Sequence, residues 1–215
     1  SHHARRISGH GSRDRVLDEI YQAVEAVIDD EVAGIGCGVP SVVDVERGIV
    51  YAVENIPSWQ EVDLGDRLFR RFGVPARIDN DANAFVYGES RFGEAKGRRN
   101  VVGLTLGTGL GTGVIHDGVL LTGAHGGVGE IGSIPYRGET LEFYCAGSFF
   151  RHAAGEPGEA VYERARAGDE EALAIFDAYG EQLGHGVMVA LYAYDPEIVV
   201  LGGSIARTAG LFMGG

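Results

Sequence analysis

Lysine is almost absent from this chain. Only Lys96 among its 18 basic residues is a lysine, and 31 Asp and Glu residues give the 215-residue sequence a net charge of −13. So strong a negative charge argues against a nucleic-acid-binding surface, and no nucleic-acid partner is expected. An acidic, lysine-poor composition is typical of salt-adapted proteins and equally of genomes rich in arginine codons, so both origins stay open.

Cysteine is scarce too. Cys37 and Cys145 are too few for a disulfide framework, which favours a reducing cytoplasm. No apolar run approaches the length of a membrane span, so no membrane partner is expected. Residues 1–12 are polar and lack the apolar core of a signal peptide, and we interpret them as a tail or tag remnant outside the fold.

The remaining chain, with 45% hydrophobic residues overall, can form a real core as one large domain or two lobes. Helical and strand patterns alternate along it, which predicts an α/β fold. A charged loop at residues 93–99 predicts a boundary between an N-terminal lobe, residues 13–97, and a C-terminal lobe, residues 98–215. The expected helices cover residues 13–30, 63–73, 81–92 and 169–194, and the expected strands include residues 32–38, 48–56, 76–78 and 197–203, with Pro57, Ser58 and Trp59 breaking the pattern.

Four carboxylate and amide side chains gather where the short strand ARI meets the next helix. They are Asp79, Asn80, Asp81 and Asn83. Asn and Asp are ordinary helix N-caps, so the cluster has a purely local interpretation. Alternatively, a carboxylate is held at the carboxyl end of a strand, where open α/β sheets bind their ligands.

The stretch LTLGTGLGTGVI places glycines between two apolar strands. The residues concerned are Gly107, Thr108, Gly109, Gly111, Thr112 and Gly113. Glycines allow backbone N–H groups to approach an anion closely, and threonine hydroxyls add donors. Glycines that merely serve a tight hairpin are an equally good explanation. The stretch is neither a Walker loop nor a dinucleotide fingerprint.

Three further signals are weak when taken singly. Glu130 lies in the glycine-rich GGVGEIGS, where a carboxylate can accept hydrogen bonds from paired sugar hydroxyls, although a solvated loop glutamate is commoner. Glu142 lies on an expected helix and is either an exposed residue or a second sugar contact. Gly202 and Gly203 end a buried strand, where a nucleotide could pack but where ordinary strand-to-helix turns look similar.

The order of these signals is specific. The succession GIGCGVP, NIPSW, NDANAFVYGE, GLTLGTGLGTGVI, DGVLLTG, GGVGEIGS, LEFYCAG and IVVLGGSIA, within residues 33–206, resembles the sugar kinases of the ROK family (repressors, open reading frames and kinases). NDANA, GTGLGTG and GEIG carry most of the resemblance. It implies an α/β fold of the actin-like (ribonuclease-H-like) ATPase type, with two lobes and an active-site cleft between them where sugar and ATP meet.

The resemblance implies a catalytic role for the cluster at the strand–helix junction. Asp81 would be the base that takes the proton from the sugar hydroxyl as it attacks the γ-phosphate. Positioning is the main requirement of that role, because the phosphoryl-transfer transition state is loose. Asn80 would bind neighbouring sugar hydroxyls, Asn83 would cap or brace the helix, and Asp79 is left structural.

Other residues match family positions that bind sugar and ATP. The implied sugar-binding residues are Gly38, Asn55, Asn80, Asp81, Glu130, Ser133 and Glu142. The implied ATP-binding residues, in the second phosphate loop and beside the adenosine, are Gly107, Thr108, Gly109, Gly111, Thr112, Gly113, Gly202 and Gly203. Mg²⁺ is expected to accompany ATP.

The chain departs from the family pattern in three places. No Asp-x-Gly-Gly-Thr phosphate loop precedes Arg13, and the sequence stops soon after its last expected helix begins, so an incomplete chain is expected. Ser133 stands where many members have a zinc-binding histidine, and no cysteine lies between it and Cys145. The segment SIPYRGETLE is also shorter than the family's zinc loop. Structural zinc needs about four ligands, so no zinc site and no other protein metal site is predicted.

The leading hypothesis is an ATP-dependent hexose kinase, most simply one that converts glucose to glucose 6-phosphate. Kinases for fructose, mannose or an N-acetylhexosamine share these motifs, and Ser133 leaves the choice of sugar open. A ROK-type sugar-responsive transcriptional regulator is an alternative, opposed by the acidity and by the lack of a helix-turn-helix in residues 1–30. A non-catalytic sugar-binding protein is another, suggested by the missing phosphate loop. A cytoplasmic homodimer is expected from the family.

Overall fold

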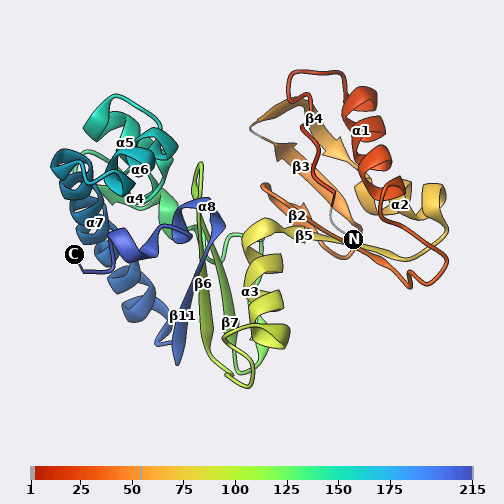
Figure 1. Ribbon diagram of the computed structural model, residues 1–215. Helices are drawn as coiled ribbons and strands as arrows, with labels where there is room; N and C mark the ends of the chain where they lie inside the picture. Colours follow the sequence, from red (N-terminus) through yellow and green to blue (C-terminus); the bar gives the residue numbers. More distant parts are fainter. Residues whose placement is uncertain (1–2, 54, 215) are drawn as a thin grey trace. The chain divides into compact units, whose positions relative to one another are not determined.

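The fold is mixed α/β, as the sequence predicts, although strands and helices follow one another in runs more than they alternate singly. The computed structural model describes residues 3–53 and 55–214. The helices are α1 (Arg13–Glu25), α2 (Leu64–Phe72), α3 (Asp81–Phe92), α4 (Leu141–Cys145), α5 (Gly147–Ala154), α6 (Gly158–Arg166), α7 (Glu170–Tyr194) and α8 (Gly203–Ala206), with 3₁₀ helices η1 (Glu130–Ser133) and η2 (Ala209–Leu211). The strands are β1 (Ile35–Val39), β2 (Val43–Asp44), β3 (Ile49–Val53), β4 (Ile56–Val62), β5 (Ala76–Asn80), β6 (Val101–Leu106), β7 (Leu110–His116), β8 (Val119–Leu120), β9 (Pro135–Tyr136), β10 (Glu139–Thr140) and β11 (Ile198–Gly202). Figure 1 follows this order by colour.

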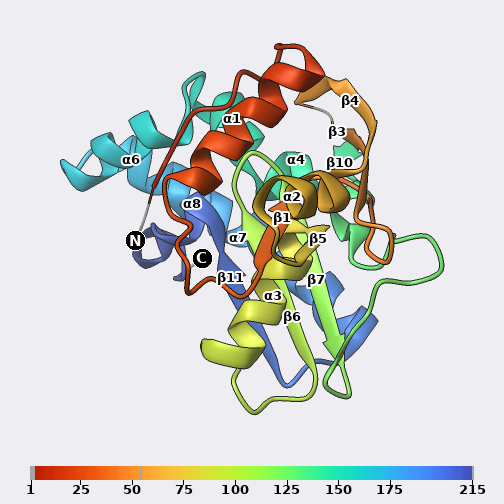
Figure 2. The same cartoon turned by 90° about the vertical axis from the view of Figure 1, so that its right-hand side faces the viewer.

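The chain divides into two units, Ser1–Ala84 and Phe85–Gly215. The first combines a parallel strand pair with an antiparallel sheet of order β2-β3-β4. Strands β1 and β5 are the parallel pair, in a register that aligns Val39 with Asn80, and Figure 2 shows them side by side. Helices α1 and α2 contribute apolar side chains to a core that comprises Val16, Leu17, Val39, Val50, Val53, Trp59, Val62, Leu64, Leu68 and Ile78.

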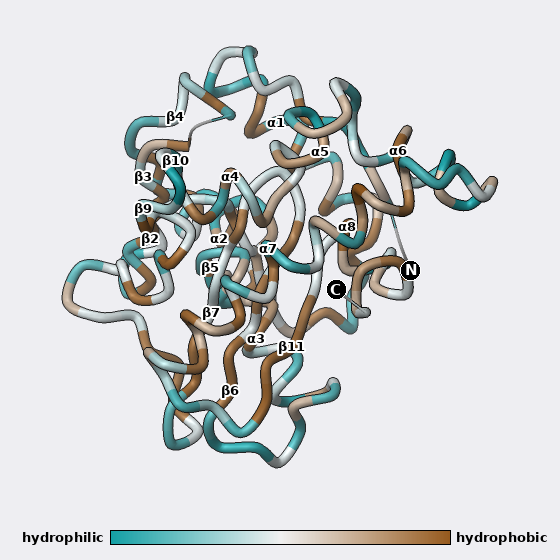
Figure 3. Tube along the Cα trace, turned by 90° about the vertical axis from the view of Figure 1, so that its left-hand side faces the viewer, coloured by the Kyte–Doolittle hydropathy of each residue, from teal (hydrophilic) through white to brown (hydrophobic). Residues whose placement is uncertain are grey.

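The second unit is built on a sheet of order β11-β6-β7-β8, in which β11 and β6 run parallel. Helix α3 covers one face, where Val86 packs with Val101, Ile115 and Val200. Helices α4, α5 and α7 lie on the other face, and Figure 1 shows the strands between α3 and α7. Figure 3 shows β6 and β11 as mainly hydrophobic segments, which agrees with strands covered on both faces.

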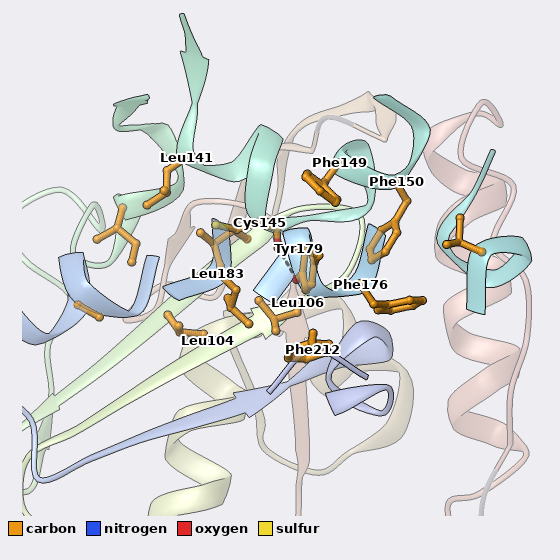
Figure 4. Close-up of a cluster of buried hydrophobic side chains, with 14 of the residues drawn as sticks. Leu104, Leu106, Leu141, Cys145, Phe149, Phe150, Phe176, Tyr179, Leu183 and Phe212 are labelled. Carbon is orange, nitrogen blue, oxygen red and sulfur yellow. Dashed lines mark hydrogen bonds between the residues drawn. The ribbon is translucent and has the colours of Figure 1, made fainter. Parts of the chain in front are cut away.

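An aromatic cluster forms the centre of the core on the α7 side. Figure 4 shows Phe149, Phe150, Phe176, Tyr179 and Phe212 packed around the ends of the strands. The hydroxyl of Tyr179, which is fully buried, donates a hydrogen bond of 2.8 Å to the backbone carbonyl of Cys145 and so satisfies its one polar group. This core holds the helices that surround the candidate site of the second unit.

Helix ends follow from local side chains and glycines. Ser12 caps α1 by accepting the N–H of Arg15, and Gly73 ends α2 with a positive φ of 73°. The predicted helix 81–92 is confirmed by α3, and the predicted helix 169–194 is α7 with Asp169 as its N-cap. No helix in the described part of the chain is long and apolar enough to cross a membrane.

The sequence prediction fails for two elements. Helix α1 ends at Glu25 rather than at residue 30, and Asp29 lies in a separate turn in which its side chain accepts the N–H of Glu31. Pro57 does not break the strand pattern and lies inside β4. Strand β4 is at the edge of its sheet, where the missing proline N–H removes no necessary hydrogen bond.

The expected lobes, residues 13–97 and 98–215, stay a prediction. The two units of the structure divide at Ala84, within the first turn of α3. Helix α3 packs tightly against the second unit's sheet, since a Cβ on Gly103 would lie 2.8 Å from Val86. Ser8 is tied to α1 because its backbone N–H and hydroxyl donate to Glu19 at 2.7 and 2.8 Å.

Candidate active site

The candidate site of the first unit lies at the carboxyl end of the parallel pair β1–β5. Gly38 is aligned with Asp79 and Val39 with Asn80, and the chain then enters α3 directly. The carboxyl ends of parallel strands are where open α/β sheets place ligands. The register therefore brings the residues of the NDANA segment to a ligand-binding edge.

Three of the four polar side chains in this segment serve the strand–helix junction itself. The side-chain oxygen of Asn80 accepts the backbone N–H groups of Ala82 at 2.9 Å and Asn83 at 3.2 Å, which makes Asn80 the N-cap of α3. The buried amide of Asn83 donates to the carboxylate of Asp79 at 3.0 Å. Asp79 and Asn83 thus have the structural, bracing roles expected of them.

Asp81 differs from its neighbours. It is the first residue of α3 and is exposed, and its carboxylate Oδ1 accepts only the adjacent N–H of Ala82 at 2.9 Å within the described residues. The positive end of the helix dipole lies at this position, which suits a negative charge. Gly38 borders it closely, since a Cβ there would lie 3.2 Å from Cα of Asp81. The carboxylate of Asp81 therefore lies beside Gly38 of β1, which has no side chain that could cover it.

The amide of Asn80 also anchors the loop after β1. Its Nδ2 donates to the carbonyl of Ser41 at 3.3 Å, and the Ser41 hydroxyl donates to the carbonyl of Ala52 at 2.8 Å. One amide hydrogen of Asn80 is left for a ligand. Asn55 is exposed in the turn between β3 and β4, and no described contact joins it to Asn80 or Asp81.

The second unit contains the glycine turn, which is shorter than the sequence predicts. Only residues 107–109 lie between β6 and β7, and the N–H of Gly107 donates to the carbonyl of Gly109 at 3.1 Å. Gly111, Thr112 and Gly113 instead belong to β7 and pair with β6. Thr112 is buried, and its hydroxyl has no hydrogen-bond partner in the described part of the chain. The turn therefore offers Gly107, Thr108 and Gly109 to a ligand.

Glu142 holds this turn in place. Its Oε2 accepts the backbone N–H of Leu110 at 2.8 Å, and a Cβ on Gly109 would approach the same oxygen to 2.5 Å. A Cβ on Gly132 would lie 3.4 Å from Cβ of Glu142, so η1 adjoins the same side chain. Glu130 and Ser133 are exposed on η1. The structure thus brings the two predicted sugar-binding segments of this unit to the predicted phosphate turn.

Gly202 and Gly203 are explained by close packing. A Cβ on Gly202 would lie 2.5 Å from the ring of Phe85, and one on Gly203, whose φ is 88°, would lie 2.3 Å from the carbonyl oxygen of Leu106. The start of α8 therefore packs closely against the end of β6. The position of Gly202 and Gly203 beside the adenosine stays a prediction. The pocket described next is lined by the neighbouring Ser204 and Ile205 and not by the two glycines.

A pocket of about 330 Å³ opens beside the glycine turn. Its walls come from the turn, from α5, α6 and α7 and from the residues that follow β11. The lining residues are Gly107, Thr108, Gly147, Phe150, Arg151, Gly158, Glu159, Tyr162, Phe176, Ser204, Ile205, Arg207 and Thr208. Sequence reasoning found only the first two, because α5 and α6 carry no motif and reach the pocket through tertiary packing.

The buried ionisable groups near this site are kept neutral. Burial raises the pKa of the Cys145 thiol to about 12 and also raises the pKa of the Tyr179 hydroxyl. Neither group is therefore a candidate nucleophile at neutral pH. Among residues 3–53 and 55–214, no three His, Cys, Asp or Glu side chains are grouped as a metal site would require.

Comparison with known proteins identifies the family. The family model described as "ROK family" matches residues 3–213, and the chain belongs to this family. Its fold is the mixed α/β, actin-like fold of the ROK sugar kinases.

The relatives include enzymes and regulators. A glucokinase from Thermotoga maritima is 35% identical, with 94% of this chain and 74% of the relative covered. A glucokinase from Streptomyces coelicolor is also 35% identical, with 92% of this chain but 64% of the relative covered. A xylose repressor from Bacillus spizizenii is 28% identical, with 96% and 58% covered. The chain thus spans about two thirds of the curated glucokinases and somewhat less of the repressor.

Solved structures give the same family. The crystal structure of a ROK family glucokinase from Streptomyces griseus in complex with glucose and AMPPNP matches with a TM-score of 0.80 at 28% identity. The match covers 93% of this chain and 75% of that one. These findings support a sugar kinase as the class of protein, with regulators such as the xylose repressor as homologues.

Proposed function

We propose that the protein transfers the γ-phosphoryl group of ATP to a hydroxyl of a hexose, with glucose as the first candidate and glucose 6-phosphate as its product. Asp81 is the catalytic base. The observation that carries the proposal is the difference between Asp81 and its neighbours: Asp79, Asn80 and Asn83 are used in the helix cap, whereas the carboxylate of Asp81 is exposed at the strand end.

The proposed reaction needs little covalent chemistry from the protein. Asp81 accepts the proton of the attacking hydroxyl while the hydroxyl oxygen bonds to the γ-phosphorus. The bond from that phosphorus to the β,γ-bridging oxygen breaks, and its electron pair stays with ADP. Asp81 then releases the proton to solvent. The rigid cap around Asp81 contributes positioning, which is the main demand of phosphoryl transfer.

Each unit, taken by itself, offers side chains that can bind hydroxyl groups of a hexose. Asn80 contributes its remaining amide hydrogen, and the exposed carboxylates and hydroxyl of η1 and α4 accept hydrogen bonds from the sugar. The proposed sugar-binding residues are Gly38, Asn55, Asn80, Asp81, Glu130, Ser133 and Glu142. Ser133 has a short neutral side chain, and the choice of hexose depends on the space that this side chain leaves beside the sugar.

ATP is proposed to bind with its phosphates at Gly107, Thr108 and Gly109 and with its adenosine in the adjoining pocket. The pocket supports this assignment, because it adjoins the glycine turn and includes the partly exposed ring of Tyr162, behind which Phe150 and Phe176 are buried. Mg²⁺ in such sites is held by substrate phosphates, water and one or two carboxylates, so it would enter as part of Mg–ATP. The described residues offer no dedicated metal cluster, and no step is assigned to a metal held by the protein alone.

The test is ADP release by the purified full-length protein with Mg–ATP and a panel of glucose, fructose, mannose, N-acetylglucosamine and N-acetylmannosamine. Asp81→Asn should lower turnover by about 10²- to 10⁴-fold, as loss of a general base does. Asp79→Asn is the matched control, because it removes the same charge and keeps an oxygen for Asn83. Turnover unchanged in Asp81→Asn would exclude Asp81 as the base.

A sugar-binding protein without turnover is the second candidate, since the matched xylose repressor belongs to a class of regulators. It predicts that a hexose raises the melting temperature of the protein while no ADP forms with any member of the panel. Turnover with one hexose excludes it.

A cytoplasmic homodimer completes the proposal. It rests on the family resemblance and on the scarcity of cysteine. Sedimentation velocity at high protein concentration tests the dimer, and a monomer there contradicts it.

A further inference from the structure

The pocket beside the glycine turn has an aromatic side and a polar side. The rings of Phe150 and Phe176 are almost fully buried and pack with centroids 5.0 Å apart, and Tyr162 lies with its centroid 6.4 Å from that of Phe176. Gly107, Thr108 and Ser204 line the polar side. A ligand with a flat ring and an anionic chain matches both sides.

The arginines of the second unit separate into two groups. Six of them have a described partner, either a carboxylate, an amide oxygen or an aromatic ring: Arg91, Arg98, Arg99, Arg137, Arg164 and Arg166. Within residues 85–214, the side chains of Arg151 and Arg207 form no ion pair, hydrogen bond or ring contact, and both line the pocket. Glu159 is the carboxylate on the same lining.

The two unpaired guanidinium groups lie on elements that adjoin Gly107. Gly147 donates its N–H to the carbonyl of Gly107 at 2.9 Å, and a Cβ on Gly147 would lie 4.0 Å from a guanidinium nitrogen of Arg151. On the other element, a Cβ on Gly107 would lie 4.0 Å from the hydroxyl of Ser204. Arg207 follows Ser204 by three residues and is the C-cap of α8, so it lies about one helical turn beyond Ser204.

We propose that Arg151 and Arg207 bind the phosphate groups of the nucleotide in this pocket. The proposal rests on the proposed function, because it assigns two residues to the ATP site of that reaction. In a chain with a net charge of −13, two unpaired guanidinium groups against the single carboxylate of Glu159 give this pocket a net positive lining, which favours an anionic ligand. A guanidinium binds phosphate with two parallel hydrogen bonds, and Lys96 is the only lysine in the sequence that could replace it.

The experiment is isothermal titration of ADP with Mg²⁺ into the full chain. The variants are Arg151→Gln, Arg207→Gln and the charge-keeping Arg151→Lys and Arg207→Lys, each measured at low and at high KCl. Each glutamine variant should weaken ADP binding about tenfold, as loss of a charged hydrogen bond does. Each lysine variant should recover part of the affinity, and the glutamine variants should depend less on KCl than wild type.

Arg166→Gln is the matched control, because Arg166 belongs to the same unit but pairs with Glu163 and does not line the pocket. Melting temperatures verify that each variant is folded. The assignment of either arginine is overturned when its glutamine variant binds ADP within twofold of wild type, or no more weakly than Arg166→Gln. Failure of wild type to bind ADP overturns both assignments.

These outcomes are separate from those of the kinase assay. Arginine-dependent ADP binding without hexose turnover would contradict the proposed reaction and leave the inference standing. Hexose turnover with normal ADP binding in both glutamine variants would contradict the inference and leave the reaction standing.

Discussion

Both units place their candidate site at the carboxyl end of a parallel strand pair, β1–β5 in the first and β6–β11 in the second, but they build it differently. In the first unit, hydrogen-bonded side chains fix the strand–helix junction. In the second, backbone atoms pack so closely around Leu106 and Gly107 that glycine is required. Side chains suit the presentation of one carboxylate, whereas bare backbone suits the approach of a chain of phosphates.

The largest expected effect is on the stability of the second unit, where backbone atoms pack closely around the glycines of the candidate site. Gly203→Ala should destabilise the second unit by about 3 kcal/mol or more, because φ is 88° and the new Cβ would lie 2.3 Å from the Leu106 carbonyl. Urea unfolding monitored by tyrosine fluorescence measures the loss. Gly210→Ala is the control, since nothing lies within 4 Å of its Cβ position. Equal stability of the two variants would show that close packing at Gly203 is unimportant.

Glu142 tests the difference between the two units further, because here a side chain supports the glycine turn of the second unit. Glu142→Ala should raise KM for ATP about tenfold, equal to about 1.4 kcal/mol, together with KM for the hexose. Glu142→Gln keeps an oxygen for the N–H of Leu110 and should spare KM for ATP while still affecting the hexose. Steady-state kinetics with each substrate varied in turn measures both constants. A rise confined to the hexose in Glu142→Ala would mean that the bond to Leu110 does not position the turn.

A smaller effect is expected for the side-chain cap of the first unit. Asn80→Ala removes the N-cap of α3 and should cost about 1 kcal/mol, or about 2–4 °C in melting temperature. Asn80→Asp retains the capping oxygen but loses the amide hydrogen bond to Ser41, so it should melt between Asn80→Ala and wild type. Calorimetry distinguishes the two variants. If they melt alike, the hydrogen bonds to Ala82 and Asn83 contribute nothing measurable.

The smallest effect concerns stability in acid, and it involves one glutamate from each unit. Backbone N–H groups of Asn100 and Arg99 lower the pKa of Glu197, and the N–H and hydroxyl of Ser8 lower that of Glu19. A carboxylate with a lowered pKa in the folded state stabilises the protein above its unfolded pKa, and this contribution is lost as the pH falls through the folded pKa. Glu197→Gln and Glu19→Gln should therefore flatten the fall of melting temperature below about pH 4. An unchanged acid profile would contradict the assignment.

Local features were predictable from the sequence because their causes lie within a few residues. Helix α3 is confirmed from Asp81 to Phe92, since capping and apolar spacing are both local signals. The bond between Glu142 and Leu110 spans 32 residues and has no sequence signature. Arg151 and Arg207 were missed for the same reason, because only the packing of α5 and α8 near Gly107 brings them to one pocket. The extent of the glycine turn was overestimated because Gly111 and Gly113 look identical whether they lie in a turn or in a strand.

The bond from Glu142 to Leu110 has a consequence for how such a protein can change under selection. A mutation at Glu142 that favoured a different sugar would also disturb the turn proposed to hold phosphate, so it would carry a penalty for every sugar. Ser133 is exposed and has no comparable tie to that turn among the described hydrogen bonds. Of these two proposed sugar-binding positions, 133 should therefore tolerate substitution more readily than 142.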